Sequence, residues 1–282
     1  MLTRRLFVPV AAAAISPVFA KNPGKPAAGR LKQSVTKGVF KGRNMTLDDM
    51  CREAANVGIY GFDLIGPEDW PTLKKYGLVP TMYPAGAGGT ISDALNRKEN
   101  HDRIRASMTQ AIDAAATGGC PNVITFSGNR RGMPDDEGAN NCVLFLNSIK
   151  AHAEEKGVNI CMELLNSKVN HKDYMCDHAA WGVSVMQRVN SPRVKLLYDI
   201  YHMQIMDGDI VRTIQNNMQY LAHFHTGGNP GRHEIDSTQE LNYRFIAQSI
   251  ADLGFKGVIA HEYTPVRDPI ESLKQAVEIC TV

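Results

Sequence analysis

Eight alternations of an apolar, strand-like run with a helix-like segment constrain this chain more than any other feature of its sequence. The strand-like runs are predicted at residues 31–40, 60–65, 78–83, 122–126, 158–165, 194–200, 220–225 and 257–263. Helix-like segments separate them, as at residues 97–117, where Ile104, Met108 and Ile112 recur at helical spacing. Regular alternation of this kind predicts a parallel sheet covered by helices.

Eight repeats favour a closed barrel over an open sheet. The length of 282 residues is close to the roughly 250 that one eight-stranded barrel uses. An open sheet that binds a dinucleotide would carry a G-x-G-x-x-G turn directly after a strand, and the glycine-rich run 84–90, which we predict to be a loop, lacks that pattern. We therefore predict one α/β domain, a single (β/α)₈ TIM barrel, over residues 31–282.

The first 20 residues differ from the remainder of the chain. Arg4 and Arg5 precede a short, alanine-rich apolar run at 8–19, which contains two prolines and is too short to span a membrane. The arginine pair resembles a twin-arginine export signal, with an ordinary secretory signal or a chance basic start as alternatives. We expect a signal peptide of the twin-arginine type at 1–20, a linker at 21–30 and an exported, periplasmic protein.

Charge and cysteine content exclude several classes of partner and fold. The chain has 31 basic and 29 acidic residues, a balance that does not indicate a surface for nucleic acid. Its six cysteines are scattered, without a C-x-x-C pair, and a chain of this length needs no disulfide framework. We therefore expect free, buried thiols and a small-molecule substrate, with neither a nucleic acid nor a membrane as partner.

Four consecutive predicted strands carry an acidic residue or a histidine near their carboxyl ends: Glu163, Asp199, His225 and Glu262. In a barrel of parallel strands these ends lie at the face where active sites are found, and neighbouring strands are about 5 Å apart. Each residue alone could be a helix cap, an ion-pair partner or a buried histidine. Three carboxylates together would repel one another strongly without a cation between them. The set predicts one divalent metal ion, for which Mn²⁺, Mg²⁺ or Co²⁺ fits best and Zn²⁺ is a further candidate.

These segments resemble the xylose-isomerase-like TIM-barrel superfamily, and within it hydroxypyruvate isomerases and related sugar isomerases and epimerases. The resemblance covers essentially all of the chain after residue 30 and is carried by MELLN at 162–166, YDIYHMQ at 198–204, HFH at 223–225, PGR at 230–232 and HEY at 261–263. It implies that the four residues bind one divalent metal and that Glu163 and Glu262 form the catalytic acid/base pair. It also implies that His202 and Arg232 contact substrate oxygens.

Two positions depart from the family pattern. Ketose epimerases of this family usually carry a further glutamate six positions after the first metal-binding one, and this chain has Val169 there. Hydroxypyruvate isomerases often have glutamine at the seventh-strand position, and this chain has His225. The first departure weakens the prediction of an epimerase. The second, together with the expected export, weakens hydroxypyruvate itself as the substrate.

The expected reaction is the isomerisation of a small hydroxy-carbonyl compound or sugar. A metal that holds a carbonyl and the adjacent hydroxyl acidifies the C–H bond between them and stabilises the enediolate that forms. His202 could instead orient Asp199, and Arg232 could instead form a surface ion pair. Glu68, after the second predicted strand, is a further candidate for substrate binding, and its alternative role is at the start of a helix.

Other functions stay open at this point. A sugar epimerase, or a lyase acting on an oxidised sugar, would use the same enediolate. An endonuclease of the superfamily uses three metals, and the near-neutral charge and the lack of further His/Asp clusters argue against it. A non-catalytic carbohydrate-binding barrel with a structural metal would not require two carboxylates that face a substrate. A homo-oligomer is compatible with the family, in which dimers and tetramers are common.

Overall fold

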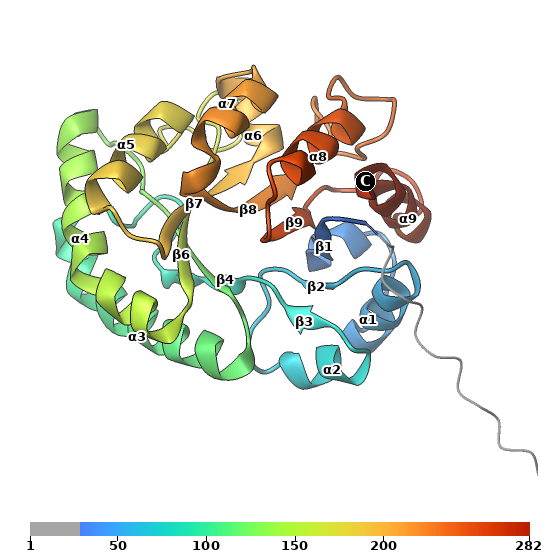
Figure 1. Ribbon diagram of the computed structural model, residues 1–282. Helices are drawn as coiled ribbons and strands as arrows, with labels where there is room; N and C mark the ends of the chain where they lie inside the picture. Colours follow the sequence, from blue (N-terminus) through green and yellow to red (C-terminus); the bar gives the residue numbers. More distant parts are fainter. Residues whose placement is uncertain (1–28) are drawn as a thin grey trace, which may run out of the picture.

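The computed structural model describes residues 29–282. The predicted signal peptide and residues 21–28 of the predicted linker lie outside this range. Within it, nine parallel strands form a nearly closed barrel with helices on the outside (Figure 1), in the order β3-β2-β1-β9-β8-β7-β6-β5-β4. The strands are β1 (Lys32–Val35), β2 (Gly61–Phe62), β3 (Val79–Pro80), β4 (Tyr83–Gly88), β5 (Asn122–Thr125), β6 (Asn159–Leu164), β7 (Val194–Asp199), β8 (Leu221–Thr226) and β9 (Val258–His261).

The short strands β3 and β4 together occupy the place of the third predicted strand. β3 pairs with β2 and β4 pairs with β5, so the chain crosses from one edge of the sheet to the other between residues 80 and 83. This split accounts for nine strands where eight were predicted, and the (β/α)₈ barrel is confirmed.

The prediction of a loop at residues 84–90 is wrong, because most of this run belongs to β4. Its glycines allow close contact with the neighbouring strand. A Cβ atom added at Gly88 would lie 2.4 Å from the carbonyl oxygen of Ile124 in β5. Glycine is normally depleted in strands, so sequence pattern alone favoured a loop.

The helices of the described part are α1 (Leu47–Asn56), α2 (Trp70–Lys75), α3 (His101–Gly118), α4 (Asp135–Lys156), α5 (Ala179–Val189), α6 (Ile200–Met206), α7 (Ile210–Asn217), α8 (Tyr243–Asp252) and α9 (Pro269–Cys280). Three short 3₁₀ helices lie at Lys37–Phe40, Lys98–Asn100 and Met218–Tyr220. Thr46, the N-cap of α1, accepts a hydrogen bond from the Asp49 amide at 3.2 Å and forms a capping box. The apolar face of α3 is buried as its spacing predicts.

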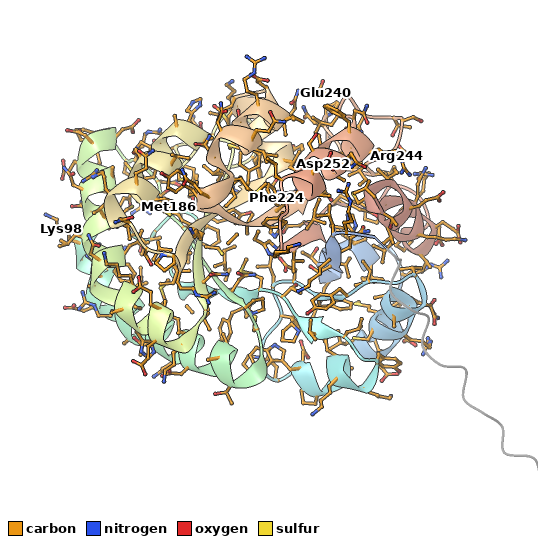
Figure 2. All side chains as sticks on the ribbon, in the orientation of Figure 1. Lys98, Met186, Phe224, Glu240, Arg244 and Asp252 are labelled. Atoms are coloured by element: carbon orange, nitrogen blue, oxygen red, sulfur yellow. The ribbon has the colours of Figure 1, made fainter. Side chains whose placement is uncertain are left out.

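The core lies between the barrel wall and the surrounding helices. The strands from β5 to β9 are buried on both faces, as parallel barrel strands are. Figure 2 shows Lys98, Glu240 and Arg244 at the outside of the molecule, whereas Phe224 of β8 is fully buried. All six cysteines lie in the described range and are buried and free, as expected. None of the helices formed by residues 29–282 has the length and apolarity that a membrane span needs.

Candidate metal centre

The structure brings the four predicted metal ligands to one point. Glu163 lies near the end of β6, Asp199 ends β7, His225 lies near the end of β8, and Glu262 directly follows β9. One ligand atom from each residue lies within 4.8 Å of the others. Parallel strands in register place their carboxyl ends side by side, which is why residues 99 positions apart in the chain meet here.

His225 stands between the three carboxylates. Its Nδ1 atom lies 2.7 Å from Glu262 Oε2, 3.3 Å from Glu163 Oε1 and 3.8 Å from Asp199 Oδ2. Although it is fully buried, this nitrogen has no partner of hydrogen-bond geometry among residues 29–282. A buried nitrogen without a partner is costly unless a ligand takes it, and one that faces three carboxylates is suited to a metal ion.

The carboxylates are crowded and poorly hydrated, which fits a site for a divalent cation. Asp199 is fully buried and Glu163 is only 5% exposed. Burial raises the pKa of Glu163, and the nearby Glu262 and Asp199 add to the effect. A divalent cation would stabilise the ionised form of all three groups. The donor set of three oxygens and one nitrogen therefore fits the predicted metal.

Arg232 enters this group from the loop between β8 and α8. Its Nη2 atom donates to Asp199 Oδ2 at 2.7 Å and to Glu262 Oε2 at 2.6 Å, and its Nε atom donates to the Glu262 carbonyl at 3.1 Å. The residue has a positive φ of 56° and directly follows Gly231. The predicted substrate-binding arginine is thus inside the site. It pairs with two candidate metal ligands rather than with a carboxylate on the open surface.

His202 is fully buried beside Arg232. Its backbone amide donates to Asp199 Oδ1 at 3.0 Å, so Asp199 also caps α6. Its Nε2 atom lies 2.7 Å from Arg232 Nη1, and its Nδ1 atom lies 2.6 Å from the side-chain nitrogen of Asn166. Burial, and then the charge of Arg232, holds the pKa of His202 well below its usual range. His202 is therefore neutral, and it touches both a candidate ligand and the predicted substrate-binding arginine.

Glu68 is the predicted site residue that the structure does not bring into this group. In the described part of the chain it forms no hydrogen bond or ion pair with any of the four candidate ligands. Its carboxylate instead folds back over Gly66, where an added Cβ would lie 2.4 Å from it. The backbone turns here, before α2, where the Asp69 amide donates to the Gly66 carbonyl at 3.0 Å.

A cleft opens beside the candidate ligands and could admit a small molecule. It has a volume of 420 Å³, and its lining includes Arg232, Glu262, Lys37 and Asp63. The position matches that of active sites in (β/α)₈ barrels, at the carboxyl ends of the strands. A small polar compound would fit there with its oxygens toward the carboxylates and Arg232.

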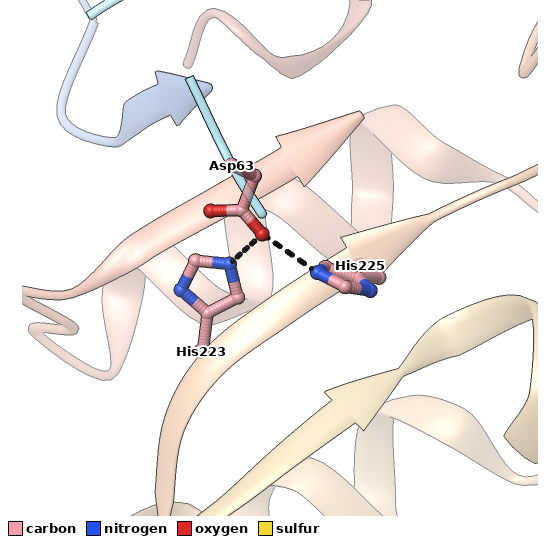
Figure 3. A group of neighbouring side chains, drawn as sticks. All are labelled: Asp63, His223 and His225. Carbon is pink, nitrogen blue, oxygen red and sulfur yellow. Dashed lines mark hydrogen bonds and ion pairs between the residues drawn. The ribbon is translucent and has the colours of Figure 1, made fainter. Parts of the chain in front are cut away.

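Asp63 is a site residue that sequence reasoning missed. It directly follows β2 and is fully buried. Its Oδ2 atom accepts hydrogen bonds from His225 Nε2 at 2.9 Å and from His223 Nε2 at 3.1 Å (Figure 3). The sequence contained the signal, because Asp63 is an acidic residue at a strand end, as Glu163 and Asp199 are. The sequence analysis selected Glu68, five residues further along the chain, as the candidate site residue of this segment.

Comparison with known proteins relates the chain to one family of barrels. A family model described as "Xylose isomerase-like TIM barrel" matches residues 71–281. A human protein provisionally named hydroxypyruvate isomerase is 33% identical over 106 residues, which are 38% of this chain and 38% of the relative. The 2-oxo-tetronate isomerase of Cupriavidus necator is 30% identical over 197 residues, which are 69% of this chain and 73% of that protein.

Solved structures share the fold at lower identity. The structure titled AP endonuclease, family 2, from Brucella melitensis matches with a TM-score of 0.77 and 24% identity, over 86% of this chain and 97% of that one. The 3-keto-D-glucoside 4-epimerase of E. coli matches with a TM-score of 0.74 and 17% identity, over 88% of this chain and 98% of that one. At these identities the likeness extends to the barrel and not to its activity.

Proposed function

This chain belongs to the xylose isomerase-like TIM barrel family, and from this premise we propose that it is a divalent-metal-dependent isomerase of a small hydroxy-carbonyl compound or sugar. The observation that carries the proposal is the unpartnered Nδ1 atom of His225, which faces the carboxylates of Glu163, Asp199 and Glu262. The names of the relatives support an isomerase, since both the human and the Cupriavidus necator proteins are named as isomerases of small oxo acids.

The four residues Glu163, Asp199, His225 and Glu262 would hold one Mn²⁺, Mg²⁺ or Co²⁺ ion. When bound, the ion would supply Lewis-acid stabilisation of the negative charge that develops on the substrate oxygens. His225 would bind through Nδ1, because its Nε2 atom donates to Asp63.

The protein's own groups would move the protons. Glu163 and Glu262 have ligand oxygens within 4.8 Å of each other. One of these carboxylates would take the proton from the carbon that carries the hydroxyl, and the C–H electrons would form the carbon–carbon double bond of an enediolate. The other would return a proton to the former carbonyl carbon, while the hydroxyl proton moves to the second oxygen. Arg232 would donate hydrogen bonds to the substrate oxygens and orient them.

A panel of candidate substrates tests the proposal. The protein loaded with Mn²⁺ is incubated with hydroxypyruvate, 2-oxo-tetronate and ketohexoses, and the products are followed by NMR. We expect one compound to be isomerised, with the rate abolished by chelation and by Glu163→Gln or Glu262→Gln. Glu278→Gln, an exposed glutamate on α9, serves as the matched control and should retain full activity. Turnover that survives chelation, or that survives both active-site substitutions, would contradict the proposal.

We also infer export by the twin-arginine route, on the basis of Arg4 and Arg5. Cell fractionation of the full chain tests this. The wild type should be recovered outside the cytoplasm, and the double substitution of both arginines by lysine should retain it inside. Equal distribution of the two proteins would exclude the twin-arginine route.

A further inference from the structure

Asp63 is a fully buried carboxylate on the Nε2 side of the His225 ring (Figure 3). The carboxylates of the candidate metal centre lie on the Nδ1 side. A charge in such a position is destabilised by several kcal/mol unless hydrogen bonds compensate for the lost water. Two of these bonds come from imidazoles, since Asp63 Oδ2 lies 2.9 Å from His225 Nε2 and 3.1 Å from His223 Nε2. Both imidazoles therefore have to present an N–H group to Asp63.

The second oxygen of Asp63 is bound by hydroxyl groups. Thr81 Oγ1 donates to Oδ1 at 2.5 Å, and Ser34 Oγ lies 3.4 Å from the same atom. Asp63 thus has hydrogen-bond donors at both of its oxygens, two imidazoles at Oδ2 and two hydroxyl groups at Oδ1.

A backbone carbonyl determines which nitrogen of His223 carries the proton. Asn122 Nδ2 donates to the Thr81 carbonyl at 2.8 Å, and a carbonyl can only accept, so the Asn122 amide has one orientation. Asn159 Nδ2 supports this orientation by donating to Asn122 Oδ1 at 2.9 Å. The Asn122 nitrogen then faces His223 Nδ1 at 3.4 Å and makes that atom the acceptor. Neutral His223 therefore carries its proton on Nε2, directed at Asp63.

This proton assignment distinguishes the Asp63 group from the metal centre beside it. Asp63, His223 and His225 have the composition of a three-residue metal site, and their ligand atoms lie within 4.8 Å of one another. In this arrangement His223 Nε2 donates its proton to Asp63, and the Asn122 amide holds the other ring nitrogen as an acceptor. The three residues therefore form a hydrogen-bonded unit beside the metal centre.

We propose that Asp63 is a positioning residue that holds His225 with its proton on Nε2, which leaves Nδ1 free to bind the divalent cation. The proposal rests on the proposed metal-dependent function and extends it to a carboxylate outside the ligand set. A carboxylate that accepts from a ligating histidine fixes the ring orientation and makes the ligand more basic. Thr81, Ser34 and His223 hold Asp63 in turn, so metal affinity depends on residues from β1 to β8.

The substitution Asp63→Asn tests this role. It preserves the size of the side chain but replaces one oxygen with an N–H donor, which cannot accept from both imidazoles. The Mn²⁺ affinity, measured by isothermal titration calorimetry, is expected to fall about 10–100-fold. Asp177→Asn is the matched control, because Asp177 is 4% exposed and paired with Arg130 at 2.9 Å, outside the metal centre. It should lower the melting temperature and leave Mn²⁺ affinity unchanged.

NMR of the wild-type protein reads the tautomers directly and does not depend on the folding of a variant. Long-range ¹H–¹⁵N correlation spectra of the Zn²⁺-loaded protein should show the proton on Nε2 for both His223 and His225, with the metal on His225 Nδ1. A proton on His225 Nδ1, or metal on its Nε2 atom, would overturn the proposal even if Asp63→Asn fails to fold.

The two proposals fail in distinguishable ways. If the wild type binds no Mn²⁺, the proposed function fails, and the role of Asp63 fails with it. If the wild type binds Mn²⁺ and Asp63→Asn binds it equally tightly, only the role of Asp63 is overturned, and the metal centre stands.

Discussion

Arg232 donates to Glu262 twice, from Nη2 to the carboxylate Oε2 at 2.6 Å and from Nε to the backbone carbonyl at 3.1 Å. The same Nη2 atom also donates to Asp199 Oδ2 at 2.7 Å. The guanidinium therefore binds oxygens that the predicted metal ion would also use. A fixed positive charge at this distance repels a divalent cation, even as it positions the substrate.

Replacing Arg232 should therefore change metal binding and turnover in opposite directions. In Arg232→Met, Mn²⁺ is expected to bind about tenfold more tightly, because a competing cation has been removed. The turnover number should fall about 100-fold, because the donors that orient the substrate oxygens are lost. Calorimetry and steady-state kinetics measure the two effects. Arg212→Met, at an exposed position on α7, is the control. A parallel loss of both properties would refute this description of Arg232.

Metal binding should release protons and should strengthen as the pH rises. Although burial opposes it, the charge of Glu262, together with the hydrogen bond to Asp63, holds the pKa of His225 well above its usual range. Burial raises the pKa of Glu163. Both groups must lose their protons before they can bind a cation, so affinity increases through the neutral range. Calorimetry in buffers of different ionisation enthalpy should reveal the release of one or more protons at neutral pH. Proton-neutral binding would contradict the assignment.

His261 should make the folded state less stable in mild acid. It is fully buried, with Nδ1 at 2.9 Å from Thr226 Oγ1 and Nε2 at 3.0 Å from Gln33 Oε1, and burial lowers its pKa to about 3. The unfolded chain binds a proton on this residue below about pH 6.5, whereas the folded chain does not. The free energy of unfolding should therefore fall by about 1.4 kcal/mol per pH unit below that point.

Denaturant titrations of wild type and His261→Gln at pH 7 and pH 5.5 measure how much of the free energy of unfolding depends on His261. The wild type should lose about 1.4 kcal/mol more than the variant between the two pH values. Equal losses in the two proteins would mean that His261 is already protonated in the folded state.

Glu234 should stabilise the loop that carries Arg232. Its Oε1 atom accepts from the amides of Val266 and Arg267, both at 3.0 Å, and from Ser272 Oγ at 2.9 Å. Glu234→Ala would leave these donors without an acceptor and is expected to lower the free energy of unfolding by about 2–3 kcal/mol. Thermal unfolding of wild type, Glu234→Ala and the control Glu278→Ala, at an exposed position on α9, measures the effect. A change of less than about 0.5 kcal/mol would show that the loop is held by other contacts.

The sequence was sufficient to predict the barrel and the meeting of four residues, because both depend on periodic patterns. Strand alternation fixed the register that brings Glu163, Asp199 and His225 together. Residues held by tertiary contacts were harder to predict. Gly88 lies in a strand because it packs against Ile124, a contact that the local sequence does not show.

Asp63 is an example at the candidate metal centre of a residue whose role depends on tertiary contacts and was therefore hard to predict. β2 has only two residues, so neither its length nor its periodicity marked where the strand ended. The bonds from Asp63 to His223 and His225 join residues 160 and more positions apart. Glu68, the acidic residue that follows the predicted strand at 60–65, has its carboxylate over Gly66 instead. The local sequence pattern predicts which strand ends carry candidate metal ligands. It does not predict which other side chains, such as Asp63, form hydrogen bonds to those ligands.

In the proposed reaction, one of Glu163 and Glu262 removes a proton from the hydroxyl-bearing carbon and the other delivers a proton to the former carbonyl carbon. It is tested most directly by running the Mn²⁺-dependent isomerisation in D₂O and locating deuterium in the product by NMR. Our account predicts deuterium on the former carbonyl carbon, and none of this exchange in Glu262→Gln. Isomerisation with full retention of the original hydrogen would contradict it, since a second carboxylate that returns the proton would deliver deuterium from the solvent.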